Sequence, residues 1–233
     1  TTITEPATPI KTGYTFAGRN APVPTTMPAG TKPFTATWTP NTNTPYVVKH
    51  YRQALDGTYP SSLMESENLT GTTATNVKPA VKTYTGFTSP APKETTILAD
   101  GSTVVEYYYT RNQYTLTWVT DGDALTGSYT KGLVLYEAPI TQPNTPTKTG
   151  YTFAGWNEAV PAKMPATNKT FTATWDANQY TITLDKQGGT GGTSSVLVTF
   201  DQTLPTIIAP TRIGYTFAGY YDAVEGNGTP YYN

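Results

Sequence analysis

The stretch Gly150-Tyr151-Thr152-Phe153-Ala154-Gly155-Trp156, followed by Phe171-Thr172-Ala173-Thr174-Trp175, decides the fold class of this chain. In the second segment Phe, Ala and Trp alternate with threonine, and in the first segment Tyr and Phe are separated by threonine. Such a period of two places alternate side chains on opposite faces of a β-strand. The flanking glycines permit a tight turn or a close approach of another backbone. We therefore expect strands with one buried face.

Both segments recur along the chain, so the sequence is a tandem repeat. The hexapeptide Gly-Tyr-Thr-Phe-Ala-Gly occurs at residues 13–18, 150–155 and 214–219. The pentapeptide at residues 171–175 also occurs at residues 34–38, where it ends in Trp38. The motif at residues 112–117 recurs at residues 178–183. The residues that define the repeated motif are Gly13, Tyr14, Phe16, Gly18, Trp38, Gly150, Tyr151, Phe153, Gly155, Trp175, Gly214, Tyr215, Phe217 and Gly219.

The spacing of these motifs divides the chain into four repeat units, with the phase of the boundaries left open. Unit 1 (residues 1–44) is the C-terminal half of a repeat, and unit 4 (residues 179–233) is partial. Unit 3 (residues 113–178) is complete. Unit 2 (residues 45–112) is divergent but can be aligned with unit 3, and the alignment matches Lys82–Phe87 with Lys148–Phe153, 66 residues later.

Within a unit, further segments alternate in the same way, such as residues 114–118, 180–184 and 196–200. Proline-rich stretches at 139–146 and 205–210 oppose long helices. We expect each unit to form about four strands and one small sheet, in a β-rich fold with α+β character at most. The junctions are only a few residues long, which predicts an elongated rod of repeat units rather than loosely linked domains.

Composition excludes several classes of function. Charged residues make up 13% of the chain and the net charge is −1, so we expect no nucleic-acid partner. The sequence has no long apolar run, so we expect no membrane insertion of this fragment. The lack of cysteine excludes disulfides and thiol chemistry. The chain starts at Thr1 without a charged-then-apolar leader, so we expect it to be an excised fragment.

Candidate catalytic and metal-binding residues do not form a recognisable constellation. His50 is the only histidine, and no nucleophile motif surrounds any serine. Asp121-Gly122-Asp123 lacks the later ligands of a calcium loop and reads as a turn. Asp222 and Glu225 are acids in a glycine-rich loop, not a pair across a cleft. We expect no enzyme activity, no metal and no cofactor.

Residues 150–156 and 171–175, with the strand at 179–184 and the Gly-rich turn at 188–192, resemble the Listeria–Bacteroides repeat, also called the internalin B-repeat. Unit 2, with Val48-Lys49-His50-Tyr51, is instead similar to mucin-binding-protein (MucBP) repeats. The resemblance implies a β-grasp-like, ubiquitin-like fold in each unit. It also implies an extracellular place on a bacterial surface, within wall-anchored adhesins whose repeats act as spacers or contact the host.

Three aromatic residues are candidate ligand contacts: Tyr108, Trp156 and Tyr220. Consecutive tyrosines such as Tyr107-Tyr108-Tyr109 must place rings on both faces of a strand, so at least one ring is exposed. The position of Trp156 is Arg19 in unit 1, so a patch there would differ between units.

Two functions remain open at this point. The first is a non-catalytic stalk that projects a distal adhesive domain, with neighbouring repeat units as partners. The second is a binding module for mucin-type glycans or a host surface protein, most plausibly through unit 2.

Overall fold

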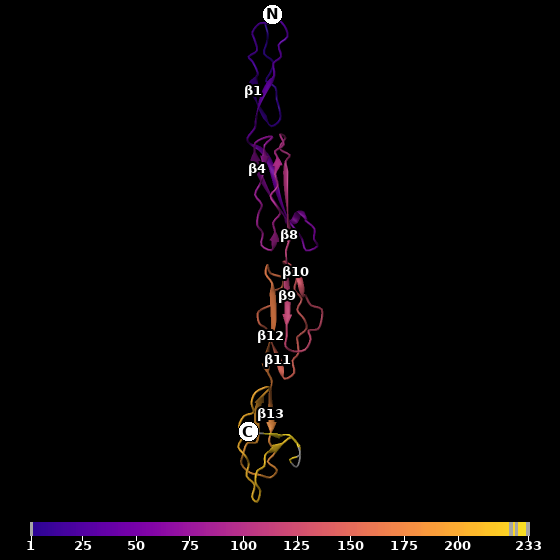
Figure 1. Ribbon diagram of the computed structural model, residues 1–233, viewed down its shortest axis with the longest axis vertical. Coiled ribbons are helices and arrows are strands. Elements are labelled where there is room, and N and C mark those ends of the chain that lie inside the picture. The colour runs from indigo at the N-terminus through magenta and orange to yellow at the C-terminus, as the bar shows by residue number, and fades with distance from the viewer. Residues whose placement is uncertain (1, 224–225, 227, 232–233) are drawn as a thin grey trace. The chain divides into compact units, whose positions relative to one another are not determined.

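The computed structural model of the protein describes residues 2–223, 226 and 228–231, and its elements are labelled in Figure 1. The expected β-rich fold is confirmed, because all elements but one short 3-10 turn are strands. In chain order they are β1 (Tyr14–Arg19), β2 (Ala36–Pro40), β3 (Thr44–Arg52), η1 (Ser61–Leu63), β4 (Met64–Gly71), β5 (Asn76–Val77), β6 (Phe87–Thr88), β7 (Thr95–Thr96), β8 (Val104–Arg111), β9 (Gln113–Val119), β10 (Gly132–Leu135), β11 (Tyr151–Trp156), β12 (Lys169–Ala177), β13 (Gln179–Thr183), β14 (Ser195–Thr199), β15 (Tyr220–Tyr221) and β16 (Pro230–Tyr231).

The chain forms two compact units. The first contains the residues up to Tyr114 with the segments Val134–Ala138 and Lys163–Thr167. The second contains Thr115–Leu133, Pro139–Ala162 and the residues from Asn168 onward. The described residues form no helix that is long and apolar enough to cross a membrane.

The first unit holds a four-stranded sheet with the order β4-β3-β8-β6, called here the first sheet. Strands β3 and β4 are antiparallel neighbours, while β3 and β8 run parallel in the middle of the sheet. Strand β6 closes the other side, antiparallel to β8. The crossover between β4 and β8 carries a small separate ladder of β5 and β7.

A second sheet, built mainly from the second compact unit, repeats this order as β10-β9-β12-β11. Its central strands β9 and β12 are parallel, and β11 is antiparallel to β12. In both sheets the strands follow the order second, first, fourth, third, with a parallel central pair. That is the arrangement expected of a β-grasp-like sheet, here with crossovers free of α-helix, as the prolines predict.

The hexapeptide forms the same bulged hairpin twice. Phe153 pairs with Trp175, after which the register shifts so that Gly155 faces Thr174 and Trp156 faces Ala173. The hairpin of β1 and β2 has the same register and the same shift at Gly18. Gly18 and Gly155 have φ angles of 115° and 132°, which side chains rarely adopt, so the bulge explains the last glycine of the motif.

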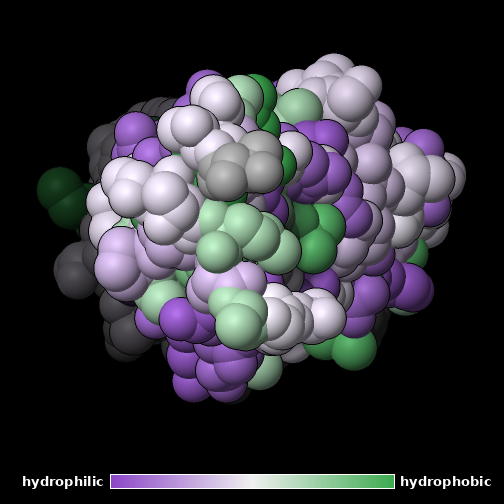
Figure 2. Space-filling view, turned by 90° about the horizontal axis from the view of Figure 1, so that it is seen from above, coloured by the Kyte–Doolittle hydropathy of each residue, from purple (hydrophilic) through white to green (hydrophobic). Residues whose placement is uncertain are grey.

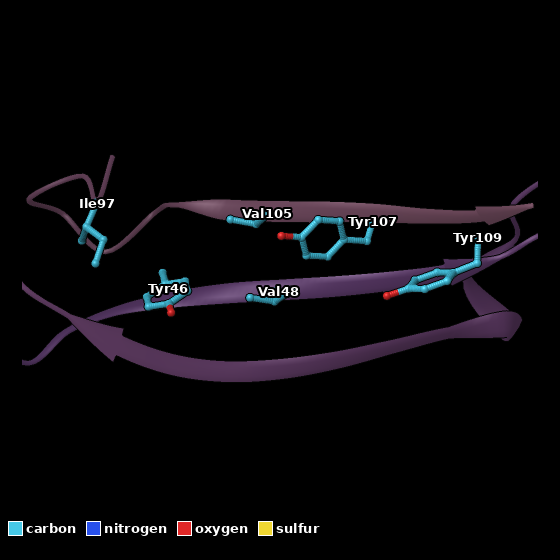
Figure 3. Close-up of a cluster of buried hydrophobic side chains, with 6 residues drawn as sticks. All are labelled: Tyr46, Val48, Ile97, Val105, Tyr107 and Tyr109. Atoms are coloured by element: carbon cyan, nitrogen blue, oxygen red, sulfur yellow. The ribbon is translucent and has the colours of Figure 1, made fainter. Parts of the chain in front are cut away.

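The core of the first sheet comes from alternate residues of its two parallel strands (Figure 3). Tyr46 and Val48 come from β3, Val105, Tyr107 and Tyr109 from β8, and Ile97 from the segment before β8. All six are buried. The Tyr107 hydroxyl donates a 2.8 Å hydrogen bond to the carbonyl of Pro79, so the tyrosines bury their rings without leaving a polar atom unpaired there.

The core of the second sheet is smaller and less polar. Its buried residues within the second compact unit are Leu116, Phe171 and Ala173. Tryptophans extend this core on the same side of the sheet, where the Trp118 ring lies 4.7 Å from Trp156 and 4.9 Å from Phe171.

The fourth repeat forms only part of this arrangement. Strands β13 and β14 pair antiparallel around the Gly188–Gly192 turn, as expected. The hexapeptide at 214–219 makes a single bridge between Arg212 and Tyr215, and Phe217 is 41% exposed. The described residues contain no counterpart of β12 to pair with it, so its aromatic side chains lack the strand that covers them in the third repeat.

The structure corrects the alignment of the divergent repeat by two residues. Lys82–Phe87 was expected to match Lys148–Phe153, residue for residue. In the sheets, Phe87 pairs with Arg111 as Tyr151 pairs with Ala177, so Phe87 is the counterpart of Tyr151 rather than of Phe153. The segment between this strand and the last strand of the repeat is therefore two residues shorter in the divergent repeat, because 24 positions separate Phe87 from Arg111 and 26 separate Tyr151 from Ala177.

Candidate functional site

The outer face of the first sheet, opposite its core, carries three side-by-side pairs from β3 and β8. Val47 lies beside Val104, Lys49 beside Glu106, and Tyr51 beside Tyr108. The intervening residues of both strands point into the core. This outer face therefore presents apolar, charged and aromatic residues to solvent in one row of pairs.

Tyr108 is the centre of an aromatic cluster on this face. Its ring stacks on Tyr51, with centroids 5.1 Å apart and planes 11° from parallel. Tyr59, in the loop after β3, meets Tyr108 edge to face at 5.1 Å, and the Lys93 ammonium lies 5.7 Å from the Tyr108 ring. Both stacked tyrosines donate hydrogen bonds to Glu106, at 2.8 Å from Tyr108 and 3.2 Å from Tyr51. The bond to Glu106 raises the pKa of Tyr108.

The exposure of this cluster agrees with the sequence analysis. Tyr107 and Tyr109 are fully buried, whereas Tyr108 is 40% exposed. Sequence reasoning missed Tyr51, Tyr59 and Lys93 as parts of the same cluster. Their contribution depends on which strand lies beside β8, and alternation within one strand carries no information about its neighbour.

The outer face of the second sheet is different in kind. At the equivalent positions β9 and β12 present exposed threonines: Thr115, Thr117, Thr170, Thr172 and Thr174. Threonine is favoured on exposed strands because its branched side chain fits the pleated surface. Only the first sheet therefore carries an aromatic and charged outer face. In the end-on view of Figure 2, hydrophobic residues occur as separate patches among hydrophilic ones.

A buried polar cluster lies on the core side of the first sheet, around His50. The imidazole is fully buried, and its Nδ1 lies 2.8 Å from the Tyr109 hydroxyl, which also accepts a hydrogen bond from the backbone N–H of Lys82. Its Nε2 has no hydrogen-bond partner and lies 3.8 Å from a Glu67 carboxylate oxygen. Burial, helped by the nearby Lys82 charge, lowers the pKa of His50.

An ionic layer lies beside this histidine. The Lys82 ammonium contacts Glu65 and Glu67, each at 2.5 Å, and these hydrogen bonds raise the pKa of Lys82 and lower the pKa of both glutamates. The Tyr84 hydroxyl donates to Glu65 at 2.8 Å, and burial raises the pKa of Tyr84 to about 12. The layer is internally paired, which indicates a structural role.

The structure places Trp156 and Tyr220 on the inner side of their repeats. Trp156 packs on the hexapeptide Phe153 at 5.4 Å, and Tyr220 packs on Phe217 at 5.1 Å and is only 9% exposed. Arg19, at the same position in unit 1, lies over Phe16 at 5.4 Å. In the Tyr220-Tyr221 pair, the exposed ring is therefore Tyr221, at 39%. Tyr108 is the sequence-predicted contact residue that the structure places on an open face.

The remaining polar candidates make contacts typical of turns and surfaces. Asp121 pairs with Lys148 at 2.6 Å, and Asp123 accepts a 2.5 Å hydrogen bond from Thr147, so both acids stabilise the turn before β11. Within the described residues no three His, Cys, Asp or Glu side chains gather as metal ligands. Glu225 lies outside the described residues.

A cavity of about 200 Å³ lies in the fourth repeat, beside Lys186, Arg212, Phe217 and Tyr220. It occupies the side of the repeat where the third repeat has β12, the strand for which the described residues hold no counterpart. The cavity is therefore explained by an uncovered sheet side.

Comparison with known proteins agrees with the repeated hairpins. The Listeria-Bacteroides repeat domain matches residues 1–21, 114–179 and 180–233, which together make up more than half of the chain. Residues 22–113, which include the first sheet, lie outside these matches. Internalin H of Listeria monocytogenes is 41% identical over 96 residues, which cover 37% of this chain and 17% of Internalin H. The chain belongs to the Listeria–Bacteroides repeat family.

Proposed function

We propose that this chain is a non-catalytic stalk segment of a bacterial surface adhesin and acts as a semi-rigid spacer for a distal adhesive domain. One observation carries the proposal. A single residue, Asn112, separates β8 from β9, and a single residue, Asn178, separates β12 from β13. A flexible linker needs several residues with free backbone rotation, and one residue between two strands does not provide them.

The surface location rests on similarity. Internalin H is similar to 37% of this chain, and the chain spans only a small part of that protein, so both the surface location and anchoring to the cell wall are proposals. The proposed repeat boundaries follow residues 44, 112 and 178, and the neighbouring repeats are the partners that each unit always has. The proposed location is extracellular.

The environment of the only histidine supports the non-catalytic part. A general base must reach a substrate proton, but His50 is fully buried and engaged with Tyr109. Its unpaired Nε2 faces Glu67 within the repeat. The acids with lowered pKa bind neighbouring lysine, serine or threonine groups, which accounts for their shifts without a reaction.

Small-angle scattering of the complete chain, together with a binding assay on mucin and cultured epithelial surfaces, tests the spacer. We expect an elongated particle and no retention on either surface. A compact particle would contradict the semi-rigid spacer, and saturable retention would favour the binding function instead.

A second candidate function is direct binding of mucin-type glycans or a host surface protein by residues 45–112, which we propose as a MucBP-like repeat. The specific support is the outer face of the first sheet. Tyr51 and Tyr108 lie on the outer face, which in the second sheet carries mainly exposed threonines, and exposed aromatic rings are suited to stacking on sugars or filling a protein contact.

The threonine face supplies a matched test of this second function. In the complete chain, Tyr51→Thr with Tyr108→Thr converts the aromatic pair to the chemistry of the second sheet. Thr117→Ala with Thr170→Ala, a directly paired couple on the threonine face, serves as the control pair. Loss of mucin retention in the tyrosine variant alone would establish binding by this face. Equal retention in both variants would exclude it.

A further inference from the structure

The three places where one repeat meets the next share a hydrogen-bond pattern centred on an asparagine. Asn41, Asn112 and Asn178 follow the last strand of the first, second and third repeats. Each backbone N–H donates a 2.9 Å hydrogen bond to the carbonyl of a glycine in its own repeat, and these glycines are Gly13, Gly86 and Gly150. The asparagine thus fixes the end of its own hairpin.

The carbonyl of each asparagine reaches forward into the next repeat. It accepts a hydrogen bond from the backbone N–H of Thr73 at 2.8 Å, of Tyr136 at 2.9 Å or of Phe200 at 2.9 Å. The asparagine side chain binds backwards, since its Oδ1 accepts from a hairpin threonine in every case: Thr15 at 2.8 Å, Thr88 at 2.6 Å and Thr152 at 2.6 Å. Each asparagine therefore makes two hydrogen bonds within its own repeat and one to the next repeat.

The glycine of each joint leaves room for a residue of the next repeat. A Cβ atom at Gly13 would lie 2.7 Å from the carbonyl oxygen of Ala99. A Cβ at Gly86 would overlap the ring of Tyr136, and one at Gly150 would overlap the ring of Phe200. The glycine φ angles are 75°, 78° and 79°, so both the backbone and the space require glycine here.

The incoming loop of the next repeat also has a repeated conformation. The residue after the forward hydrogen bond is Ala74, Glu137 or Asp201, and its φ angle is 63°, 61° or 57°. Residues other than glycine avoid this left-handed region at a cost of about 1–2 kcal/mol. Its recurrence at three equivalent positions indicates that the joint geometry imposes it.

Different side chains reinforce the same backbone pattern at two joints. At Gly86, Arg111 donates to the Glu137 carboxylate at 2.7 Å and to the Tyr136 carbonyl at 2.8 Å. At Gly150, the Tyr151 hydroxyl donates to Asp201 at 2.9 Å, and its ring packs edge to face on Phe200 at 5.5 Å. The backbone pattern is constant, whereas the side chains are particular to each pair of repeats.

We propose that the glycine and asparagine at the end of each repeat form an interaction surface whose partner is the next repeat. The glycine leaves room for one residue of that repeat, and the asparagine forms hydrogen bonds on both sides of the joint. Docking of this kind couples the local stability of neighbouring repeats, as in other linear repeat proteins. The proposal goes beyond the spacer function, because the contacts stand whether or not the chain projects another domain.

The chain contains its own control for a test of the joint. Gly150 and Gly214 occupy the same hexapeptide and have φ angles of 79° and 78°, yet a Cβ at Gly214 meets nothing within 4 Å. Gly150→Ala and Gly214→Ala therefore impose the same backbone strain. Only Gly150→Ala displaces Phe200.

Hydrogen exchange in the complete chain measures the effect on the joint amides of Asn178 and Phe200. We expect about tenfold or faster exchange of these amides in Gly150→Ala and little change in Gly214→Ala, because a tenfold change corresponds to about 1.4 kcal/mol of local opening. Phe200→Ala removes the seated ring without backbone strain and should also speed exchange at Asn178. Equal exchange in the two glycine variants, or an Asn178 amide unaffected by Phe200→Ala, would overturn the proposal.

Discussion

The first and second sheets share their strand order but little of their chemistry. Both place a parallel pair in the middle, β3 with β8 and β9 with β12. The first fills its core with tyrosines and a buried histidine, whereas the second uses Leu116, Phe171 and tryptophans. Their outer faces contrast in the same way, with paired tyrosines on one and threonines on the other. The alternation of inward and outward residues is thus kept in both sheets, while the side chains that fill the core and the outer face diverge.

The largest expected effect separates the core and outer faces of the first sheet. Tyr107→Ala should lower the free energy of unfolding of residues 44–111 by about 3–5 kcal/mol, because it empties a fully buried site and leaves the Pro79 carbonyl unpaired. Tyr108→Ala, one residue away on the outer face, should cost about 1 kcal/mol or less. Urea denaturation followed by hydrogen exchange measures both, and equal losses would refute the assignment of faces.

A second difference between the sheets is their response to acid. The folded-state pKa of His50 lies below its ordinary value of 6.5, so the folded protein binds this proton less readily than the unfolded chain. The contribution of neutral, buried His50 to the free energy of unfolding is therefore fully present above pH 6.5 and is lost as the pH falls through the folded-state pKa. The second sheet contains no histidine and should be unaffected in this range.

Unfolding free energies at pH 7.5 and pH 5.0 test this difference. In the wild-type chain, hydrogen exchange should report a loss confined to residues 44–111. His50→Gln should remove most of that dependence. The same pH dependence in His50→Gln would assign the effect to other groups.

A smaller effect concerns the outer faces alone. Tyr51→Thr with Tyr108→Thr should cost about 0.5–1.5 kcal/mol, the energy of one stacked aromatic pair, without changing the fold. Thermal unfolding monitored by circular dichroism measures this cost. A loss as large as that of Tyr107→Ala would mean that the aromatic face belongs to the core rather than to a surface.

The smallest expected effect concerns Ala74, in the loop between β4 and β5. Ala74→Gly relieves the left-handed strain but adds freedom to the unfolded chain, so a net gain below about 1 kcal/mol is expected. Ala80→Gly, at an exposed position in the same repeat, has no left-handed strain to relieve and should destabilise slightly. A clear loss in Ala74→Gly, measured by thermal unfolding, would contradict the strain.

Sequence alone predicted the strands of the second sheet because alternation is local. The pattern around Leu116 and around Phe171 gives the strand and its buried face without knowledge of its neighbours. The strand order was not predictable in this way, since a period of two does not say which strand lies alongside. For the same reason the cluster of Tyr51, Tyr59 and Tyr108 was not seen as a unit.

The bulge explains why the candidate contact residue Trp156 lies on the core side of its sheet. Strict alternation from Phe153 would place Trp156 on the outer face, but the register shift at Gly155 returns it to the core side beside Ala173. The first glycine of the hexapeptide was expected to allow a close approach, and Phe200 makes that approach at Gly150. Its partner lies 50 residues away along the chain, beyond the reach of any local pattern.

Cross-strand proton contacts by nuclear magnetic resonance test most directly that both regions fold as the same sheet. We expect contacts between Val47 and Val104 in the first sheet and between Leu116 and Lys169 in the second, both typical of parallel neighbours. Observation of both sets would establish one strand order for two dissimilar sequences. Contacts of the second set alone, with β3 and β8 unpaired, would contradict the account.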